Sequence, residues 1–156
     1  MRAAQRGDPI ALDGLVRALT PYVGRICGAV ALERGDDAMQ ETFIAVLNNI
    51  GSLRDPAALH GWVRRIAVRQ AVRQARAGEI AVETPDLPAS EIDLSSVIDV
   101  RAVLADLTPE HRAVLVLRDV DGLSEADVAQ LLHVPPGTVK SRLHRARTEF
   151  ARRWRP

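Results

Sequence analysis

Polar and basic side chains near the end of the chain are spaced as one stripe of a helix. Over residues 136–153 the apolar stripe consists of Val139, Leu143, Ala146 and Phe150, and a second stripe consists of Lys140, Ser141, His144 and Arg145. Lys and Arg donate to guanine O6 and N7, and Ser donates or accepts. The second stripe can therefore contact base edges, while Arg118 and Arg142 add cations that suit phosphates.

The residues before this helix predict how the stripe is positioned. Ser124 begins a short helix, with Asp127 three residues later in a capping-box arrangement. Residues 133–136 then predict a tight turn. Together they predict a helix-turn-helix whose second helix enters a major groove. A merely solvated basic helix is the plainer interpretation, and the turn and short preceding helix count against it.

A second basic stripe lies in the first half of the chain. At 100° per residue, four arginines of a helix over 56–77 fall within an arc of about 80°: Arg65, Arg69, Arg73 and Arg76. Another side carries Val63, Ile66, Ala67 and Gln70. Four like charges on one stripe favour an anionic partner. Trp62 can stack on an unpaired base or pack half-buried, and residues 53–58 can cradle an extruded base.

A third surface is acidic and polar. The predicted core stripe of the helix near 36–50 is Met39, Phe43, Val46, Leu47 and Ile50. The opposite face is Asp37, Gln40, Glu41 and Asn48. Such a face suits docking on a basic partner, although most faces of this kind are only solvated.

No pattern indicates catalysis, and we expect neither enzyme activity nor a metal or cofactor. The histidines at 60, 111, 133 and 144 lack metal-ligand spacing, and no phosphate loop or nucleophile elbow is present. Cys27 is the only cysteine, no apolar stretch approaches 18 residues, and Met1 to Asp8 has no signal-peptide core. These observations predict a cytoplasmic protein without membrane insertion.

The elements that carry these residues are predicted to be helices throughout. Aromatic content is 3%, and helix-forming Ala, Leu and Arg dominate. Capping residues precede proline at Asp8-Pro9, Thr20-Pro21, Asp55-Pro56 and Thr108-Pro109, so each dipeptide predicts a helix start. The expected helices span 9–19, 21–33, 36–50, 56–77, 96–106, 109–120, 124–132 and 136–153.

Charge is distributed unevenly and predicts two modules. Net charge is +4 over residues 1–76, −6 over 77–107 and +3 over 108–156. Residues 78–95 contain two prolines and five acids, which favours a flexible acidic linker. The expected fold is all-α, with small helical domains at 1–77 and 96–156.

Four segments in order resemble the signatures of extracytoplasmic-function (ECF) sigma factors of the sigma-70 family. They are Asp37 to Phe43, Gly61 to Ala67, Leu107 to Arg112 and Gly137 to Arg147, and Gly7-Asp8-Pro9 also resembles the family's start. The resemblance implies a sigma-two domain at 1–77 and a sigma-four domain at 96–156. It implies a monomer that docks on core RNA polymerase, including its flap, and is commonly controlled by an anti-sigma factor.

The resemblance also implies a role for each surface. Asp37, Gln40 and Glu41 would dock on the clamp helices of the largest polymerase subunit. The segment from Arg54 to Arg76, with Trp62, Arg65, Arg69 and Arg73, would melt the minus-ten element and capture a flipped base. Lys140, Ser141, His144 and Arg145 would face bases of the minus-thirty-five element, with Arg118 and Arg142 on its backbone. The acidic linker would occupy the RNA path.

Two departures leave the preferred minus-ten sequence open. Arg69 stands where many members have Asn, and Ala38 where many have a bulky aliphatic residue. The main alternative is a dimeric helix-turn-helix regulator that binds an operator without polymerase. A protein-binding regulator of polymerase is a third interpretation, and it would tolerate removal of the charges from Arg65 to Arg76.

Overall fold

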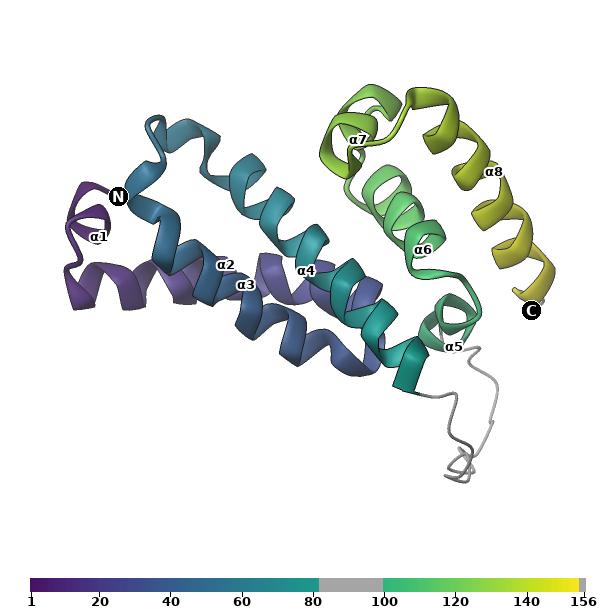
Figure 1. Cartoon of the computed structure of the whole chain (residues 1–156), viewed down its shortest axis with the longest axis horizontal. Coiled ribbons are helices and arrows are strands. Elements are labelled where there is room, and N and C mark those ends of the chain that lie inside the picture. Colours follow the sequence, from purple (N-terminus) through teal and green to yellow (C-terminus); the bar gives the residue numbers. More distant parts are fainter. Residues whose placement is uncertain (82–99, 155–156) are drawn as a thin grey trace. The chain divides into compact units, whose positions relative to one another are not determined.

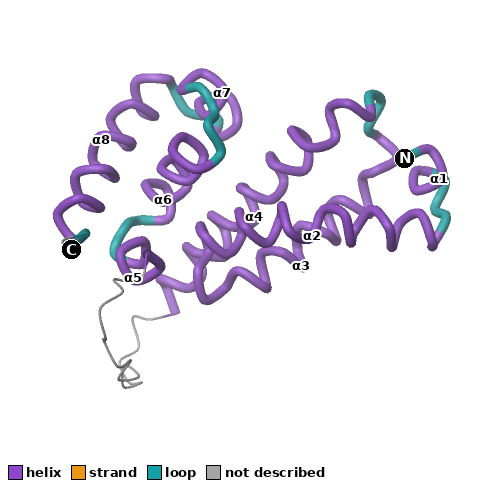
Figure 2. The backbone as a smooth tube through the Cα atoms, turned by 180° about the vertical axis from the view of Figure 1, so that it is seen from behind, coloured by secondary structure: helices purple, strands orange, loops and turns teal. Residues whose placement is uncertain are grey.

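The computed structural model describes residues 1–81 and 100–154, whose regular structure is entirely helical (Figures 1 and 2). The all-α prediction is thereby confirmed for these residues. The chain divides into two compact units, Met1–Gln74 and Ala75–Pro156. Of the linker expected over 78–95, residues 78–81 continue a helix, and the rest lies outside the described residues.

The first unit packs α2 against α3 and α4. Its helices are α1 (Arg2–Gln5), α2 (Pro9–Ala31), α3 (Gly35–Asn49) and α4 (Leu59–Ala81), with 3-10 turns η1 (Leu32–Arg34), η2 (Ile50–Ser52) and η3 (Pro56–Ala58). Its core includes Leu19, Val23, Ile26, Val46 and Val63, all fully buried. Helix α4 continues through Gly78 to Ala81, so the helix end predicted at residue 77 is wrong.

Three of the four capped prolines begin helical structure, as predicted. The side chain of Asp8 accepts a hydrogen bond from the Ala11 amide at 2.8 Å, and Pro9 is the first residue of α2. Asp55 caps η3 and Thr108 caps α6 in the same way. The side chain satisfies an amide that the helix leaves unpaired, and proline lacks one such amide.

The helix start predicted at Thr20-Pro21 is wrong, because α2 runs through Pro21 without interruption. The hydroxyl of Thr20 donates to the Val16 carbonyl instead of capping a new helix. Proline in a helix interior removes one hydrogen bond. Here the buried stripe continues on both sides of Pro21 through Leu19 and Val23, and its packing outweighs that loss.

Helix α3 is rotated relative to the predicted core stripe. Its buried residues are Gly35, Ala38, Thr42 and Val46. Of the predicted stripe, Val46 and Ile50 are buried, Met39 and Phe43 are half-buried, and Leu47 is 38% exposed. A Cβ added to Gly35 would lie 3.0 Å from the Cα of Gly28 on α2. The small residues therefore let the backbones of α2 and α3 approach closely, and this approach selects the buried face.

The second unit is built around α8. Its elements after the tail of α4 are α5 (Val100–Ala105), α6 (Pro109–Leu115), the π-helical turn η4 (Val116–Val120), α7 (Glu125–Leu132) and α8 (Pro136–Arg153). Leu107, Val114, Leu117, Val128 and Val139 form its core. The helix predicted over 109–120 is present as α6 and η4, and residues 96–99 of the helix expected at 96–106 lie outside the described residues.

Candidate nucleic-acid interfaces

Helices α7 and α8 form the predicted helix-turn-helix. Ser124 and Asp127 make the expected capping box at the start of α7. His133 ends α7 in a left-handed conformation with φ of 54°, and the Val134 amide donates to the Ala129 carbonyl. Val139, Leu143 and Ala146 of α8 are buried within the unit. The turn therefore fixes α8 with its apolar stripe inward.

The four residues expected to face bases lie on the solvent side of α8. Lys140, Ser141, His144 and Arg145 are all exposed. Ser141 donates to the Thr138 carbonyl at 3.0 Å, and its oxygen can still accept from a base. This side presents the donors and acceptors that major-groove contacts require.

The two predicted phosphate contacts differ from these four. Arg142 is half-buried, and its charge acts on Glu110. Burial raises the pKa of Glu110, but a backbone hydrogen bond, the hydrogen bond and charge of Arg76 and the charge of Arg142 together lower it below its usual value. Arg118 is half-buried and donates to the Leu123 carbonyl in the loop before α7. Arg147 is exposed and makes two hydrogen bonds to Asp119 on η4, at 2.5 and 3.0 Å. Arg118 and Arg147 therefore brace the unit.

The arginine stripe of α4 is exposed along its length. Arg65, Arg69, Arg73 and Arg76 are exposed, and the residues of the other side, Val63, Ile66, Ala67 and Gln70, are buried. Arg73 lies 3.2 Å from the Glu41 carboxylate, and within the second unit Arg76 pairs with Glu110. Arg54 is exposed in the loop between η2 and η3.

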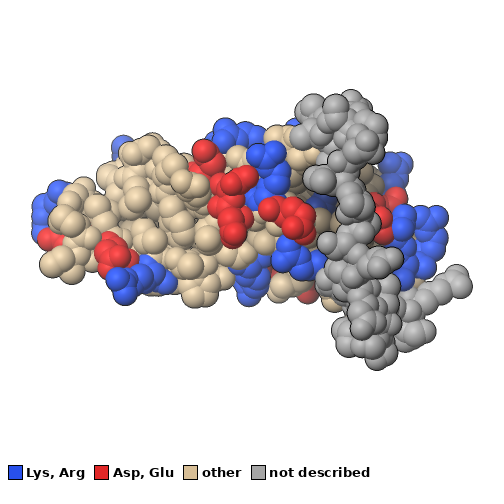
Figure 3. Space-filling model, turned by 90° about the horizontal axis from the view of Figure 1, so that it is seen from below, with Lys and Arg blue, Asp and Glu red and all other residues tan. Residues whose placement is uncertain are grey.

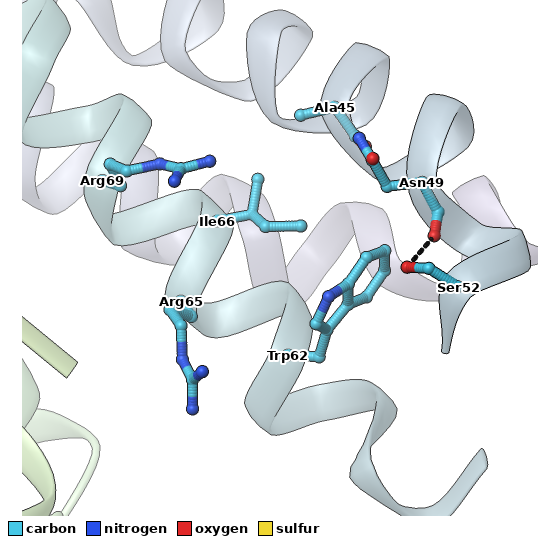
Figure 4. A pocket seen from close by; sticks show the side chains of 7 residues that line it. All are labelled: Ala45, Asn49, Ser52, Trp62, Arg65, Ile66 and Arg69. Carbon is cyan, nitrogen blue, oxygen red and sulfur yellow. Dashed lines mark hydrogen bonds between the residues drawn. The ribbon is translucent and has the colours of Figure 1, made fainter. Parts of the chain in front are cut away.

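A pocket of about 270 Å³ lies between the end of α3 and the first half of α4 (Figure 4). Its lining consists of Ala45, Asn49, Ser52, Trp62, Arg65, Ile66 and Arg69. Trp62 is half-buried and its indole faces Ser52, while Arg65 points away from that ring. An aromatic floor with cations at the rim suits an unpaired base and its phosphates.

The acidic face of α3 is solvent-accessible and includes apolar residues that the sequence analysis missed. Asp37 lies 3.4 Å from Arg34 and is 57% exposed at its side chain, and Glu41 is 42% exposed. Ile44 and Leu47 continue the same face and are 47% and 38% exposed. The available signal was their spacing, because Ile44 lies four and three residues after Gln40 and Glu41, and Leu47 lies three residues after Ile44. Figure 3 shows acidic and basic side chains side by side on one face of the molecule.

Comparison with protein families matches each half of the chain. Residues 15–79 match Sigma-70 region 2, and residues 98–150 match Sigma-70, region 4. The chain is 35% identical to the ECF RNA polymerase sigma factor SigM of Mycobacterium tuberculosis, over 94% of this chain and 78% of the relative. It is 31% identical to the RNA polymerase sigma-H factor of Pseudomonas aeruginosa, over 97% and 90%.

Two solved structures share the fold. The sigma factor RpoE of Bartonella quintana, in complex with the anti-sigma factor NepR, aligns with a TM-score of 0.68 at 19% identity, covering 90% of this chain and 94% of that one. CnrH, in complex with the cytosolic domain of CnrY, aligns with a TM-score of 0.62 at 22% identity, covering 96% and 91%.

A pocketed helical unit joined to a helix-turn-helix unit defines a DNA-recognising transcription protein. The chain belongs to the ECF sigma factors of the sigma-70 family. It is an RNA polymerase sigma factor that directs promoter-specific initiation, and the operator-binding alternative is not favoured. Its relatives are regulatory proteins that act on a soluble, cytoplasmic polymerase.

An apolar window in the first unit contradicts one expectation from the sequence. The stretch Pro9–Ser52 contains an 18-residue window of mean hydropathy 1.3, so the expectation that no apolar stretch approaches 18 residues is wrong. This is weak evidence for a membrane span, because a core helix passes the same test and α2 buries Val23, Ile26 and Val30. Within 1–81 and 100–154, no three His, Cys, Asp or Glu side chains group to hold a metal ion.

Proposed function

We propose that the first unit captures the unpaired strand of the minus-ten element. The observation that carries this is the pocket between α3 and α4, with Trp62 inside and Arg65 and Arg69 beside it. A base inserted there stacks on the indole, which is worth about 1–3 kcal/mol for a base on an aromatic ring. The exposed cations Arg54, Arg73 and Arg76 extend the contact along the phosphates.

The second unit reads the minus-thirty-five element through α8. Lys140 and Arg145 donate to guanine edges, and Ser141 and His144 supply groups that donate or accept. Arg142 contacts the backbone from the flank of the helix. Arg118 was assigned to the backbone as well, and its bond to Leu123 supports a positioning role for it at the turn.

The exposed face of α3 docks on the clamp helices of the largest polymerase subunit. Asp37, Gln40 and Glu41 supply charge and hydrogen bonds, and Ile44 and Leu47 add apolar area next to them. Apolar groups surrounded by polar ones are typical of protein interfaces. The second unit contacts the polymerase flap.

The free protein is a cytoplasmic, non-enzymatic monomer held by an anti-sigma factor until induction. Two neighbours in fold support only the anti-sigma part of this proposal, since one is described with the anti-sigma factor NepR and the other with the cytosolic domain of CnrY. Residues 78–95 link the domains 1–77 and 96–156, and their acids mimic the transcript in the RNA path.

Co-elution with bacterial core RNA polymerase on a sizing column tests the docking assignment. Wild type should co-elute, and Glu41→Arg should not. Asp13→Arg on α2 is the matched control, because Asp13 is equally acidic but lies outside the α3 face. Co-elution of Glu41→Arg with core polymerase would contradict the docking role of the α3 face. A free protein that runs as a dimer and does not bind core polymerase would instead support the operator-binding alternative.

A further inference from the structure

The side chain of Gln5 joins the short helix α1 to the turn that follows α3. Its amide nitrogen, Nε2, donates to the carbonyl oxygen of Ile50 at 3.2 Å and to that of Leu53 at 2.6 Å. Gln5 is half-buried, and its neighbour Ala4 is 2% exposed. A carboxamide nitrogen carries two hydrogens, so one side chain can donate to both carbonyls. Gln5 therefore holds both ends of η2 from an element much earlier in the chain.

The turn that Gln5 holds carries part of the pocket wall. Ser52 lies between the two carbonyls in sequence and lines the pocket together with Asn49. The Ser52 hydroxyl donates to the Asn49 carbonyl at 2.7 Å, and the Asn49 side chain donates to the Ala45 carbonyl at 2.8 Å. In Figure 4 the indole of Trp62 faces Ser52. A displacement of η2 would therefore change the space beside the indole.

The turn by itself is weakly fixed. It is a single 3-10 turn, closed by the bond from the Leu53 amide to the Ile50 carbonyl at 3.2 Å. Hydrogen bonds of 3-10 turns have poorer geometry than those of α-helices, and Gly51 has more backbone freedom to lose than any other residue type. Ile50 and Leu53 are buried, whereas Gly51 and Ser52 are exposed. The bonds from Gln5 therefore brace a wall whose own side chains are open to solvent.

We infer that Gln5 is a positioning residue for the pocket, which fixes the wall formed by Asn49 and Ser52 and so sets the base selectivity without touching DNA. This inference rests on the proposed minus-ten function. Asn49 and Ser52 offer amide and hydroxyl groups to the edge of a base, and such groups discriminate between bases only when they are held in place. Stacking on Trp62 acts on any base. Loss of the brace therefore lowers selectivity and spares most of the sequence-independent affinity.

Holoenzyme reconstituted with core RNA polymerase tests the inference by fluorescence anisotropy with labelled non-template oligonucleotides of the minus-ten element. The pocketed position is identified first, as the abasic site that weakens binding by wild type but not by Trp62→Ala. Four oligonucleotides then carry each base at that position. Selectivity is the ratio of the dissociation constants for the weakest and the tightest of the four.

Gln5→Met keeps the length of the side chain and removes both donors. It should lower the selectivity by about 3- to 10-fold, the effect of one or two lost hydrogen bonds. Mean affinity for the four oligonucleotides should change by less than about 2-fold, because stacking and phosphate contacts remain. If Gln5→Met melts early, Gln5→Asn serves instead, since it keeps the amide and shortens the side chain by one methylene.

Two further variants separate positioning from a general loss of stability. Gln5→Lys restores a donor long enough to reach the two carbonyls, so it should recover most of the selectivity. Val30→Ala is the control, because Val30 is fully buried on α2 and the pocket lining comes from α3, η2 and α4. It should lower the stability and leave the selectivity unchanged.

Amide hydrogen exchange of the free protein gives a readout that needs no DNA. The Leu53 amide donates within η2, so it should exchange faster in Gln5→Met than in wild type. The Val23 amide, in the middle of α2, is the internal reference and should keep its protection. Equal protection of the Leu53 amide in the two proteins would overturn the inference.

The binding series can overturn the inference as well. Wild-type selectivity in Gln5→Met would do so, and so would an equal loss in Val30→Ala, no recovery in Gln5→Lys, or equal binding of all four bases by wild type. A different result marks failure of the proposed function itself. In that case no abasic site would weaken wild type while leaving Trp62→Ala unaffected, and the pocket assignment on which the inference rests would be wrong.

Discussion

The Arg73 side chain on α4 lies 3.2 Å from the Glu41 carboxylate on α3, so one ion pair joins the arginine stripe to the acidic face. The two side chains are 60% and 42% exposed. An exposed pair of this kind contributes roughly 0–1 kcal/mol to folding. Glu41 is therefore available to a polymerase partner at little cost to the fold.

We expect Glu41→Ala to lower the free energy of unfolding by no more than about 1 kcal/mol, because its pairing with Arg73 is exposed. The same change should sharply weaken binding to core polymerase. Urea titration gives the first quantity, and a sizing-column binding series gives the second. A double-mutant cycle with Arg73→Ala should show weak coupling in folding, and coupling above about 1 kcal/mol would contradict this interpretation.

Substitutions on α8 should separate base reading from backbone contact. Lys140→Ala and Arg145→Ala should each cost about 1–3 kcal/mol at particular promoter positions. Arg142→Ala should weaken all promoters similarly and reduce the salt slope by about 1. Holoenzyme binding to a promoter library with single changes in the minus-thirty-five element measures both effects. Equal losses on every promoter for all three variants would refute the assignment of Lys140 and Arg145.

Arg118→Ala should act on stability more than on DNA binding. Its guanidinium is half-buried and donates to the Leu123 carbonyl, and removing such a bond costs about 1–3 kcal/mol. Thermal melting should show the loss, whereas the exposed control Arg145→Ala should change stability by about 0.5 kcal/mol or less. An unchanged melting temperature together with weaker binding to all promoters would instead support a contact of Arg118 with the phosphate backbone.

Stability should fall in alkaline solution through Cys27. Burial raises the pKa of this thiol from 9.0 to about 11, and the contact with Thr42 lowers it by less. The folded state therefore keeps a proton that the unfolded state releases between pH 9 and about 11, so stability is full below pH 9 and declines above it. The decline should be on the order of 2 kcal/mol.

Urea unfolding of wild type and Cys27→Ala at pH 8, 9, 10 and 11 measures the Cys27 effect. The variant should be less stable at pH 8, because it loses a buried side chain, but its stability should fall less steeply with pH. Parallel pH curves for the two proteins would contradict a buried, protonated thiol.

Local signals predicted most of the fold. Capped prolines placed the starts of α2, η3 and α6, and the capping box placed α7, because these signals depend on neighbours within one helical turn. The helix start predicted at Pro21 is wrong because the packing that stabilises α2 on both sides of this proline involves residues distant in sequence. The buried side of α3 was assigned only in part, with Val46 and Ile50 buried and Leu47 exposed, because the approach of Gly28 and Gly35 is a tertiary feature.

The sequence predicted which side chains belong to each candidate site, but not which other residues those side chains contact. Exposure of the arginine stripe and of the α8 face followed from helical spacing. The contact of Arg118 with Leu123 depends on the turn after η4, and that of Arg147 with Asp119 depends on how η4 and α8 pack. Helical spacing within α8 encodes neither contact. The pocket needs residues from α3 and α4 together, so only Trp62 and the arginines of its lining stood out beforehand.

The hydrogen bond of Arg118 to the Leu123 carbonyl has a consequence for binding to DNA of unrelated sequence. Sequence-independent affinity for duplex DNA grows with each cation that meets a phosphate. Arg118 is half-buried and engaged with the Leu123 carbonyl, so it is poorly placed to add to that affinity. We therefore expect Arg118 to contribute little when the free subunit meets duplex DNA of unrelated sequence.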